Sequence, residues 1–382
     1  MKLSINKLFE IAQKSNYCPI LCKFLQPRCS TQLELLDLMA KKSKKSHVDS
    51  PINARRSLKN IKSLQRLYRD TLDFTLTIEK DQELDVRESK TLQISSRTKK
   101  FILNKFEFLE ARHSTVVESF ADIVTLIRYD DRDEDLISKF LHIQTSVAIL
   151  LQHGFLLSSK KFYQQTGCVQ YNCDLLTMCE GVIDHAINLA EHNIDGINRC
   201  PSINIHLDQG EGLEVNENMW GVDCIPSSVR FVLLELLKNA ISSTLLQNGT
   251  RNISLPPIDV ILRSTNTHII VYVHDRGTGL RGRTLHDLSK FVCNVNTKEA
   301  QLIQASYQPQ SASLSGMGAG LGVSIVWATK FGGELELHDG ESLELNGLNS
   351  SKFGFGGVTA KFSIPKDVDI EENLVFNIES KD

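Results

Sequence analysis

The chain has 382 residues, of which 41% are hydrophobic and 23% are charged, as in ordinary globular proteins. Its formal net charge of −3 excludes the global basic field that many nucleic-acid-binding proteins carry. Its nine cysteines form no C-x-x-C pair, which argues against a zinc site and favours reduced thiols.

Residues 1–30 are basic and partly amphipathic. They carry lysines and one arginine against a single acid, Glu10, and "MKLSINKLFEIAQK" places Leu3, Leu8 and Ile11 near one helical face. This pattern is compatible with an organelle transit peptide and also with an ordinary first helix. The sequence shows no obvious cleavage site, and both interpretations stay open at this point.

Residues 31–165 predict a helical domain. Four stretches carry apolar residues at steps of three and four, the period of amphipathic helices. Short connectors separate them, no glycine precedes Gly154, and no run reaches the roughly 18 apolar residues of a membrane span. We therefore expect a four-helix bundle. The stretches begin "TQLELLDL", "INARRSLKN", "SRTKKFILN" and "EDLISKFLH".

Residues 166–365 predict a second domain of mixed helix and sheet. All 22 glycines lie at or after Gly154. A mixed sheet covered by helices is the natural layered solution, so the fold class is α+β. The tail, residues 366–382, is acidic and is expected to be loosely held. The β-type runs are 202–207, 258–263, 268–275, 333–338 and 358–364, and the helical runs are 175–192, 226–247 and 317–331.

The helical run "VRFVLLELLKNAISSTLL" carries polar residues inside an apolar stretch. Glu235 and Asn239 are four apart and share one helix face, with Lys238 beside them. Taken alone, such a pair is more often a solvated face than a site.

The run "IIVYVHDRGTGL" ends a strand in Asp275, and Gly277 and Gly279 follow. An aspartate there can accept hydrogen bonds from a ligand amine, and glycines let a planar ring approach the backbone. Taken alone, a strand followed by a turn is the better interpretation.

The third segment, "SGMGAGLGVSIV", places glycines at alternate positions, Gly316, Gly318 and Gly320, just before a helical run. Backbone N–H groups at such a helix start favour phosphate oxygens. An ordinary loop would look the same if this segment stood alone.

The order and spacing of the three segments are more specific than any one of them. Asn239 precedes Asp275 by 36 residues, and Gly279 precedes Gly316 by 37. The combination resembles the N, G1 and G2 boxes of the GHKL ATPase and kinase superfamily. Within it, "ELLKNAISST", "RHSTVVESFADIV" and "FLHIQTSVAILLQHG" resemble segments of the mitochondrial 2-oxo acid dehydrogenase kinases.

The resemblance covers roughly residues 31–365 and implies a helical bundle followed by a GHKL-type α/β sandwich that binds ATP. It implies a protein serine kinase of the mitochondrial matrix that inactivates the alpha subunit of a 2-oxo acid dehydrogenase. Pyruvate dehydrogenase is the favoured target and the branched-chain enzyme the alternative. ATP and Mg²⁺ are the implied cofactors, with K⁺ as a further candidate. The implied partners are a second copy of the chain and the lipoyl domains of the acyltransferase core, with no nucleic acid and no membrane span.

The resemblance also assigns roles. Glu235 matches the general base, Asn239 the Mg²⁺ ligand and Asp275 the adenine-binding aspartate, while Lys238 is placed to reach phosphate. Residues 291–315 match the ATP lid. The remaining nucleotide-binding positions are Gly277, Gly279, Asn296, Thr297, Gly316, Met317, Gly318, Ala319, Gly320 and Leu321.

Several positions depart from the family pattern. Phe231 replaces a histidine that often lies four residues before the catalytic glutamate, and Gln144 and Ala148 replace arginines of the fourth helix. Gly322 replaces a proline, Asn296 the first lid threonine, and "GGVTA" a G-T-D motif. The Asp-Trp pair of the family's C-terminal extension does not occur. These departures leave open a non-catalytic scaffold that binds the dehydrogenase complex.

Two further alternatives fit less well. A two-component histidine kinase shares the ATP fold, but the chain has no H-E-x-x-x-P motif. GHKL chaperones and mismatch-repair ATPases place the ATPase domain at the N-terminus, whereas here it follows the helices.

Overall fold

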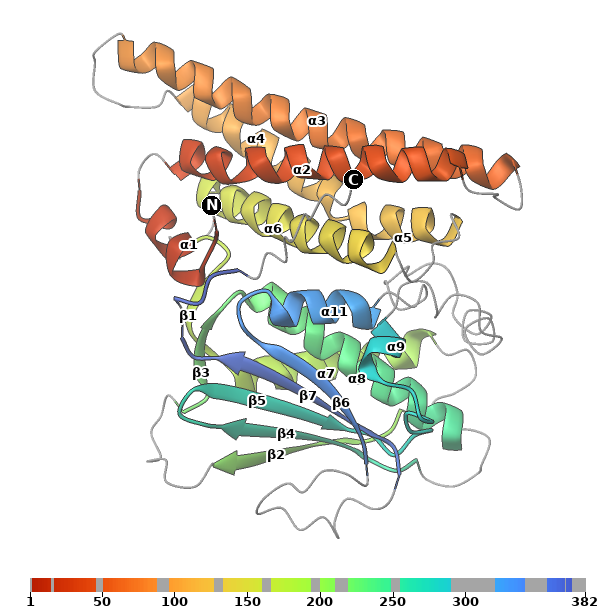
Figure 1. Ribbon diagram of the computed structural model, residues 1–382. Coiled ribbons are helices and arrows are strands. Elements are labelled where there is room, and N and C mark those ends of the chain that lie inside the picture. The colour runs from red at the N-terminus through yellow and green to blue at the C-terminus, as the bar shows by residue number, and fades with distance from the viewer. Residues whose placement is uncertain are drawn as a thin grey trace. The chain divides into compact units, whose positions relative to one another are not determined.

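The structure is a computed structural model that combines helices and sheets (Figure 1), which confirms the α+β class. The chain divides into two compact units between Gln170 and Tyr171, where the sequence predicted a boundary near residue 165. The structure describes residues 2–14, 17–45, 51–87, 96–126, 133–159, 166–193, 200–209, 219–248, 255–289, 320–340, 356–367 and 369–372.

The first unit is built from helices. Its described helices are α1 (Ile5–Ala12), α2 (Tyr17–Lys45), α3 (Pro51–Arg87), α4 (Ser96–His113), α5 (Val116–Leu126) and α6 (Glu134–Ser158). Helix α2 packs on α3 and α6, while α4 packs on α6 and α5 on α3. Apolar side chains at helical spacing, such as Ile61, Leu64 and Tyr68 of α3, are buried between them.

Helix α2 begins well before the predicted start at residue 31. Its first half buries Leu21, Phe24 and Leu25 in the helical core, and Arg28 beside them is only 5% exposed. Helix α1 is capped by the Ser4 hydroxyl, which accepts a hydrogen bond from the Lys7 amide at 3.0 Å. Residues 17–30 are therefore part of the packed helices, and the question of a transit segment stays a prediction.

The predicted third helix is interrupted. Ser114 and Thr115 separate α4 from α5, and their hydroxyls donate to the carbonyls of Ala111 and Arg112. Side chains that bond the local backbone in this way compete with helix continuation, and periodicity alone does not reveal it.

Gln144, one of the departures from the family pattern, lies in a buried polar network. Its amide oxygen accepts from the Tyr68 hydroxyl, and its amide nitrogen donates to the His113 carbonyl at 3.2 Å. The His113 ring is 2.9 Å from the Thr71 hydroxyl, and burial lowers the pKa of His113 to about 4. The network links α3, α4 and α6 through neutral groups.

Helix α6 is long and apolar enough, by length and composition alone, to cross a membrane. In the structure, 72% of its apolar window is buried, as is usual for a helix in the core of a domain. All eight cysteines in the described part of the chain are free thiols.

The second unit is built on a five-stranded sheet in the order β2-β4-β5-β7-β6. Strand β2 runs parallel to β4, and the other neighbours are antiparallel. The strands are β2 (Ile203–Gln209), β4 (Ile258–Ser264), β5 (His268–His274), β6 (Glu334–Asp339) and β7 (Val358–Pro365). A separate pair, β1 (Gln170–Asp174) and β3 (Gly221–Cys224), was not predicted.

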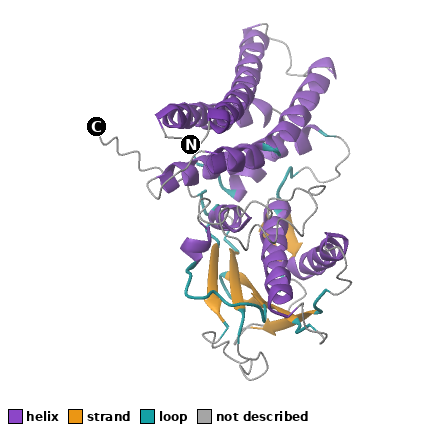
Figure 2. Ribbon diagram, turned by 90° about the vertical axis from the view of Figure 1, so that its right-hand side faces the viewer, coloured by secondary structure: helices purple, strands orange, loops and turns teal. Residues whose placement is uncertain are grey.

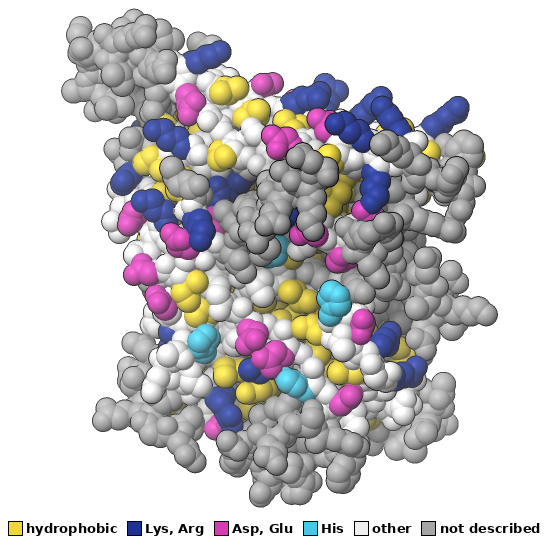
Figure 3. All heavy atoms as spheres, viewed as in Figure 1, with side chains coloured by type: hydrophobic (Ala, Val, Ile, Leu, Met, Phe, Trp, Pro, Cys, Tyr) yellow, Lys and Arg dark blue, Asp and Glu magenta, His cyan; other side chains and the backbone are white. Residues whose placement is uncertain are grey.

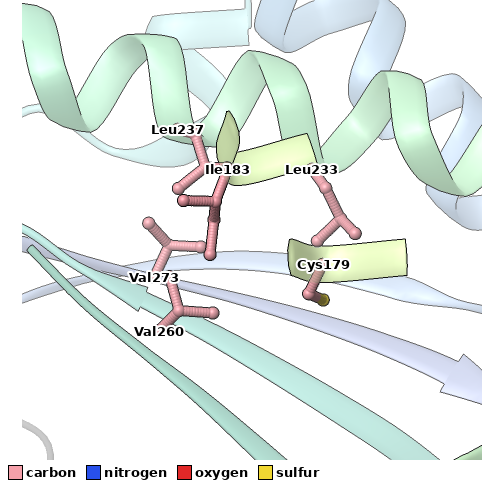
Figure 4. Close-up of a pocket in the computed structure, with 6 residues that line it drawn as sticks. All are labelled: Cys179, Ile183, Leu233, Leu237, Val260 and Val273. Atoms are coloured by element: carbon pink, nitrogen blue, oxygen red, sulfur yellow. The ribbon is translucent and has the colours of Figure 1, made fainter. Parts of the chain in front are cut away.

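Helices cover one face of this sheet (Figures 1 and 2). They are α7 (Leu175–Asn193), α8 (Pro226–Asn248) and α11 (Gly320–Thr329), with the short α9 (Leu285–Ser289) beside α11. Alternate strand residues such as Val260 and Val273 point into the core that the helices close, where six apolar side chains from α7, α8, β4 and β5 line a small cavity (Figure 4). The sheet therefore holds α8 and the end of β5 in a fixed relation.

Candidate active site

Helix α8 presents the predicted catalytic carboxylate. Its apolar positions, among them Val232 and Leu236, are buried against the sheet and fix the rotation of the helix. Glu235 is only 3% exposed, and one of its oxygens, Oε1, accepts a hydrogen bond from Lys238 Nζ at 2.5 Å. The other oxygen, Oε2, is buried and has no hydrogen-bond partner among the described residues. A buried carboxylate left half unsatisfied is unusual in a folded protein.

The first residue of α11 lies directly against this free oxygen. A Cβ atom placed on Gly320 would be 2.2 Å from Glu235 Oε2, so that either the carboxylate or the start of α11 would have to shift. The glycine therefore allows the start of α11 to meet the carboxylate. Amide groups in the first turn of a helix lack intrahelical acceptors and carry partial positive charge, so this end suits anionic oxygens.

Asp275 follows β5 and is 6% exposed. Its Oδ1 atom accepts from the Gly277 amide at 2.8 Å and from the Val358 amide at 3.3 Å. Burial raises the pKa of Asp275 to about 6, against the opposing effect of these hydrogen bonds. The carboxylate is thus fixed by backbone donors while it stays close to its titration range at neutral pH.

Close backbone contacts shape the turn after Asp275. A Cβ on Gly277 would lie 2.0 Å from the Ser243 hydroxyl of α8, and one on Gly357 would lie 1.9 Å from the Asp275 carbonyl oxygen. The Ser243 hydroxyl also accepts from the Thr278 amide at 3.1 Å. Glycine at these positions lets the turn lie directly on α8, one helical turn after Asn239.

Two supporting carboxylates were not identified from the sequence. Asp339, at the end of β6, accepts from the Leu280 amide at 2.9 Å. Asp259 of β4 is 4% exposed and accepts from Arg276 Nη2 at 2.6 Å and from His206 Nε2 at 2.9 Å. Arg276 also donates to the Pro257 carbonyl, so the residue next to Asp275 is tied to the sheet. No local motif marks these positions, because their partners lie far away in sequence.

The structure brings the described members of the predicted site around α8. Glu235 meets the start of α11, and the turn of Asp275, Gly277 and Gly279 packs beside the later part of the same helix. Asn239 lies exposed on α8 between them, and Leu321 is half-buried in α11. Six predicted residues lie outside the described part of the chain: Asn296, Thr297, Gly316, Met317, Gly318 and Ala319. The assigned roles stay predictions.

Phe231, where the family often has histidine, lies one turn before Glu235. It is half-buried, and its ring centroid is 6.4 Å from that of Trp327 in α11. The position that could carry a titratable partner for the carboxylate is therefore used for packing between α8 and α11.

The candidate site is thus built around one helix, α8. The chain is similar to proteins that are named as kinases. The mitochondrial pyruvate dehydrogenase (acetyl-transferring) kinase isozyme 1 of Homo sapiens is 26% identical over 212 residues, which cover 53% of this chain and 45% of that protein. The pyruvate dehydrogenase kinase of Schizosaccharomyces pombe is 24% identical over 310 residues, or 78% of this chain and 68% of that protein. No protein-family model matches the chain.

The chain is a distant relative of the mitochondrial pyruvate dehydrogenase kinases, which confirms the predicted resemblance. It spans about half the length of the first curated relatives it matches. A third relative, from Ascaris suum, is 25% identical and covers 62% of this chain and 60% of its own length. All three are named as mitochondrial proteins, which supports the predicted mitochondrial location.

The residues present fit a nucleotide with its metal. Glu235 Oε2 is a buried acceptor without a partner among the described residues, and Gly320 lets the backbone at the start of α11 approach it. Asp275 is an anchor held by backbone amides. Within the described residues, no group of three His, Cys, Asp or Glu side chains could hold a metal alone. A hard cation at Asn239 would therefore rely on the phosphate oxygens and water for its other ligands.

Proposed function

We propose that the protein is an ATP-dependent protein serine kinase of the mitochondrial matrix that phosphorylates the alpha subunit of a 2-oxo acid dehydrogenase. The observation that carries the proposal is the buried Glu235, whose Oε2 atom has no partner among the described residues and faces the glycine that begins α11. A carboxylate in this state is suited to accept one proton from an incoming hydroxyl.

Glu235 would act as the general base. Lys238 holds the Oε1 atom at 2.5 Å, so the carboxylate is oriented and the proton of the substrate serine would pass to Oε2. In phosphoryl transfer the protein itself performs little covalent chemistry. Most of the rate enhancement comes from positioning the reactants and stabilising charge. The rigid placement of Glu235 on a buried helix meets this need.

Asp275 would orient the adenine. Its Oδ1 is occupied by two backbone amides, so Oδ2 is the atom proposed to accept from the adenine amino group. The turn that begins at Gly277 lies against α8 and would form the floor under the ring. Mg²⁺, when bound through Asn239 and the phosphates, would neutralise part of the charge on the transferring group.

Pyruvate dehydrogenase is the proposed target because the relatives from Homo sapiens, Schizosaccharomyces pombe and Ascaris suum carry its name. The branched-chain enzyme is the alternative. By the same resemblance we propose a homodimer, docking on the lipoyl domains of the acyltransferase core, and K⁺ as a further bound ion.

A second candidate is a non-catalytic scaffold with the same fold. The observation that favours it is Phe231, whose ring packs toward Trp327 in place of a histidine beside the carboxylate. A scaffold would keep nucleotide binding, because Asp275 and its glycines are intact, while failing to transfer phosphate.

The test is radiolabel transfer from γ-labelled ATP to purified pyruvate and branched-chain dehydrogenase components, assayed in parallel. We expect label on serine of one alpha subunit. Glu235→Gln should lower transfer by about a thousandfold, the range for loss of a general base, while ATP binding is retained. If the protein bound ATP but labelled neither substrate, the kinase proposal would be rejected in favour of the non-catalytic scaffold. Full transfer by the Gln variant would remove Glu235 from the mechanism.

A further inference from the structure

Helix α3 carries a row of basic side chains on its outer face. Five of them follow one another at alternating steps of four and three residues, which places them on one side of an α-helix. All five are exposed, and from the first to the last the row spans about 21 Å. We refer to this set as the α3 stripe: Arg55, Lys59, Lys62, Arg66 and Arg69.

Some cations near the α3 stripe are neutralised by acids, whereas the stripe itself is not paired within the described residues. Arg56 pairs with Asp122 at 3.1 Å, and Arg112 pairs with Asp70 at 3.0 Å. No member of the stripe forms an ion pair with any residue in the described part of the chain. Lys and Arg side chains gather in the upper part of Figure 3, where α3 runs in the same view in Figure 1.

The stripe is a local feature that the net charge of −3 hides. Its nearest acids lie to the side or beyond its end. Asp37 of α2 is engaged by the Gln65 amide at 2.6 Å, Asp70 is engaged by Arg112, and Asp73 follows one turn after the last cation. The row itself contains no acid, so it presents uninterrupted positive potential over four helical turns.

We propose that the α3 stripe binds the surface of an anionic phospholipid bilayer. Clusters of Lys and Arg on one helix face attract anionic headgroups, and each cation near the surface adds to the affinity. Ile52, 75% exposed, and Leu76, 41% exposed, lie on the same face before and after the stripe. Such apolar side chains can enter the interface while the cations stay among the headgroups.

A bilayer suits this surface better than a folded acidic protein. Headgroups move laterally and can match any spacing of cations, whereas a protein must place its carboxylates in a fixed pattern. Exposed ion pairs between proteins add little each, so a bare row of charges is weak grounds for a specific protein interface. The attachment would be peripheral.

The test is co-sedimentation of the full chain with vesicles of phosphatidylcholine alone and of phosphatidylcholine mixed with phosphatidylglycerol. We expect binding to the mixed vesicles only, weakened by high salt. Replacing all five stripe residues by Gln should lower this binding at least a hundredfold. The matched control replaces five other exposed lysines of the same unit by Gln and should stay within about threefold: Lys14, Lys23, Lys99, Lys100 and Lys105.

A charge-preserving variant separates charge from shape. Arg55→Lys with Arg66→Lys and Arg69→Lys should bind the mixed vesicles like the wild type, and circular dichroism should show all variants folded. Equal losses in the stripe and control variants would overturn the proposal, as would a stripe variant that still binds. Binding to soluble poly-glutamate without binding to vesicles would indicate that the stripe binds an acidic protein and not a bilayer.

Discussion

The two ends of α11 each lie beside a Lys–Glu pair whose carboxylate is buried, and the two pairs are not equivalent. At the start of the helix, Gly320 touches Glu235, which is paired with Lys238. Just past its last turn, Lys330 pairs with Glu372 at 3.4 Å, and neither side chain is exposed at all. Burying such a pair costs desolvation free energy that good geometry has to offset.

The difference between the pairs lies in the second oxygen of each carboxylate. Glu235 Oε2 is buried without a partner, whereas no side-chain atom of Lys330 or Glu372 is among the unsatisfied buried groups of the described residues. The pair at the end of α11 holds the segment around Ile370, which packs over Gly332. One pair is thus complete and structural, and the other keeps an open acceptor where chemistry is proposed.

The largest expected effect is a loss of stability in a variant that keeps phosphoryl transfer. Glu372→Gln leaves Lys330 buried without its counter-charge, which should cost about 3–5 kcal/mol of unfolding free energy. At about 2–4 °C for each kcal/mol, calorimetry should show the melting temperature lower by roughly 10 °C. Transfer at low temperature should persist.

Glu235→Gln should show the reverse, with transfer lost and the melting temperature close to that of the wild type. If both variants lost stability equally and both kept transfer, the distinction between the two pairs would be wrong.

The second effect concerns the contact between Gly320 and Glu235. Gly320→Ala would place a methyl group against Oε2 and displace either the carboxylate or the start of α11. Misplacement of a catalytic group by about 1 Å can cost about a hundredfold in rate, and we expect that loss in kcat. The unfolding free energy should also fall, by about 1–3 kcal/mol, because the added methyl group overpacks a buried contact.

Gly181→Ala in α7 is the matched control, since among the described residues nothing except the neighbouring backbone of α7 itself lies within 4 Å of the added methyl group. It should leave kcat unchanged. An unaltered kcat in Gly320→Ala as well would mean that Glu235 does not act from the position the structure gives it.

The third effect is on nucleotide affinity and its pH dependence. Asp275→Asn keeps an Oδ1 acceptor for Gly277 and Val358 but turns Oδ2 into a donor, which should weaken ATP binding about ten- to a hundredfold. In the wild type, the carboxylate acceptor is present above the pKa of about 6 and lost below it. Calorimetric titrations from pH 5 to 8 should therefore show a pH-dependent loss that the Asn variant lacks, once the titration of ATP itself is subtracted.

The same raised pKa makes a prediction about folding. The folded state holds a proton more tightly than the unfolded chain between the ordinary value of 3.8 and about 6, so the unfolding free energy falls as pH rises through this window. Above it, Asp275→Asn should be more stable than the wild type. A variant that bound ATP normally, or that lost stability at pH 7, would contradict the role of Asp275 as a buried ligand-binding carboxylate.

Hydrophobic periodicity predicted much of this fold because most elements bury one face. The strand expected at 258–263 is β4, ending at Ser264, and the helix expected at 226–247 is α8, ending at Asn248. The four-residue β3 was missed because it is too short to show alternation. The early start of α2 was missed because residues 1–30 were set apart as a basic N-terminal segment, whereas the helix begins at Tyr17 and contains Pro27.

The candidate site was predicted as a set of motifs but not as a set of contacts. Spacing places Glu235 and Asn239 on one helix, and Asp275 at the end of a strand, because both periods are local. Spacing does not reveal that Gly320, far along the chain, would touch Glu235, nor that Asp339 and Asp259 support the turn after Asp275. These contacts depend on how the sheet brings distant segments together.

The smallest expected effect tests whether the sheet positions that turn. Asp259 connects Arg276 to β2 through His206, and Arg276 adjoins Asp275. Asp259→Asn removes a charged acceptor from the half-buried Arg276 guanidinium and should weaken ATP binding about three- to tenfold, the range for one lost hydrogen bond. Measured as a dissociation constant, this change should appear without loss of maximal transfer rate, because Glu235 does not contact this network.

The matched control is Asp208→Asn, which breaks a similar pair with Arg263 between the same two strands. Asp208 has no hydrogen bond to the turn after Asp275 among the contacts of the described residues, so ATP affinity should be unchanged in this variant. If ATP binding were weakened equally in both variants, the sheet would influence ATP affinity only through its stability. A selective loss in Asp259→Asn would mean that the buried carboxylate orients the nucleotide-binding turn through Arg276.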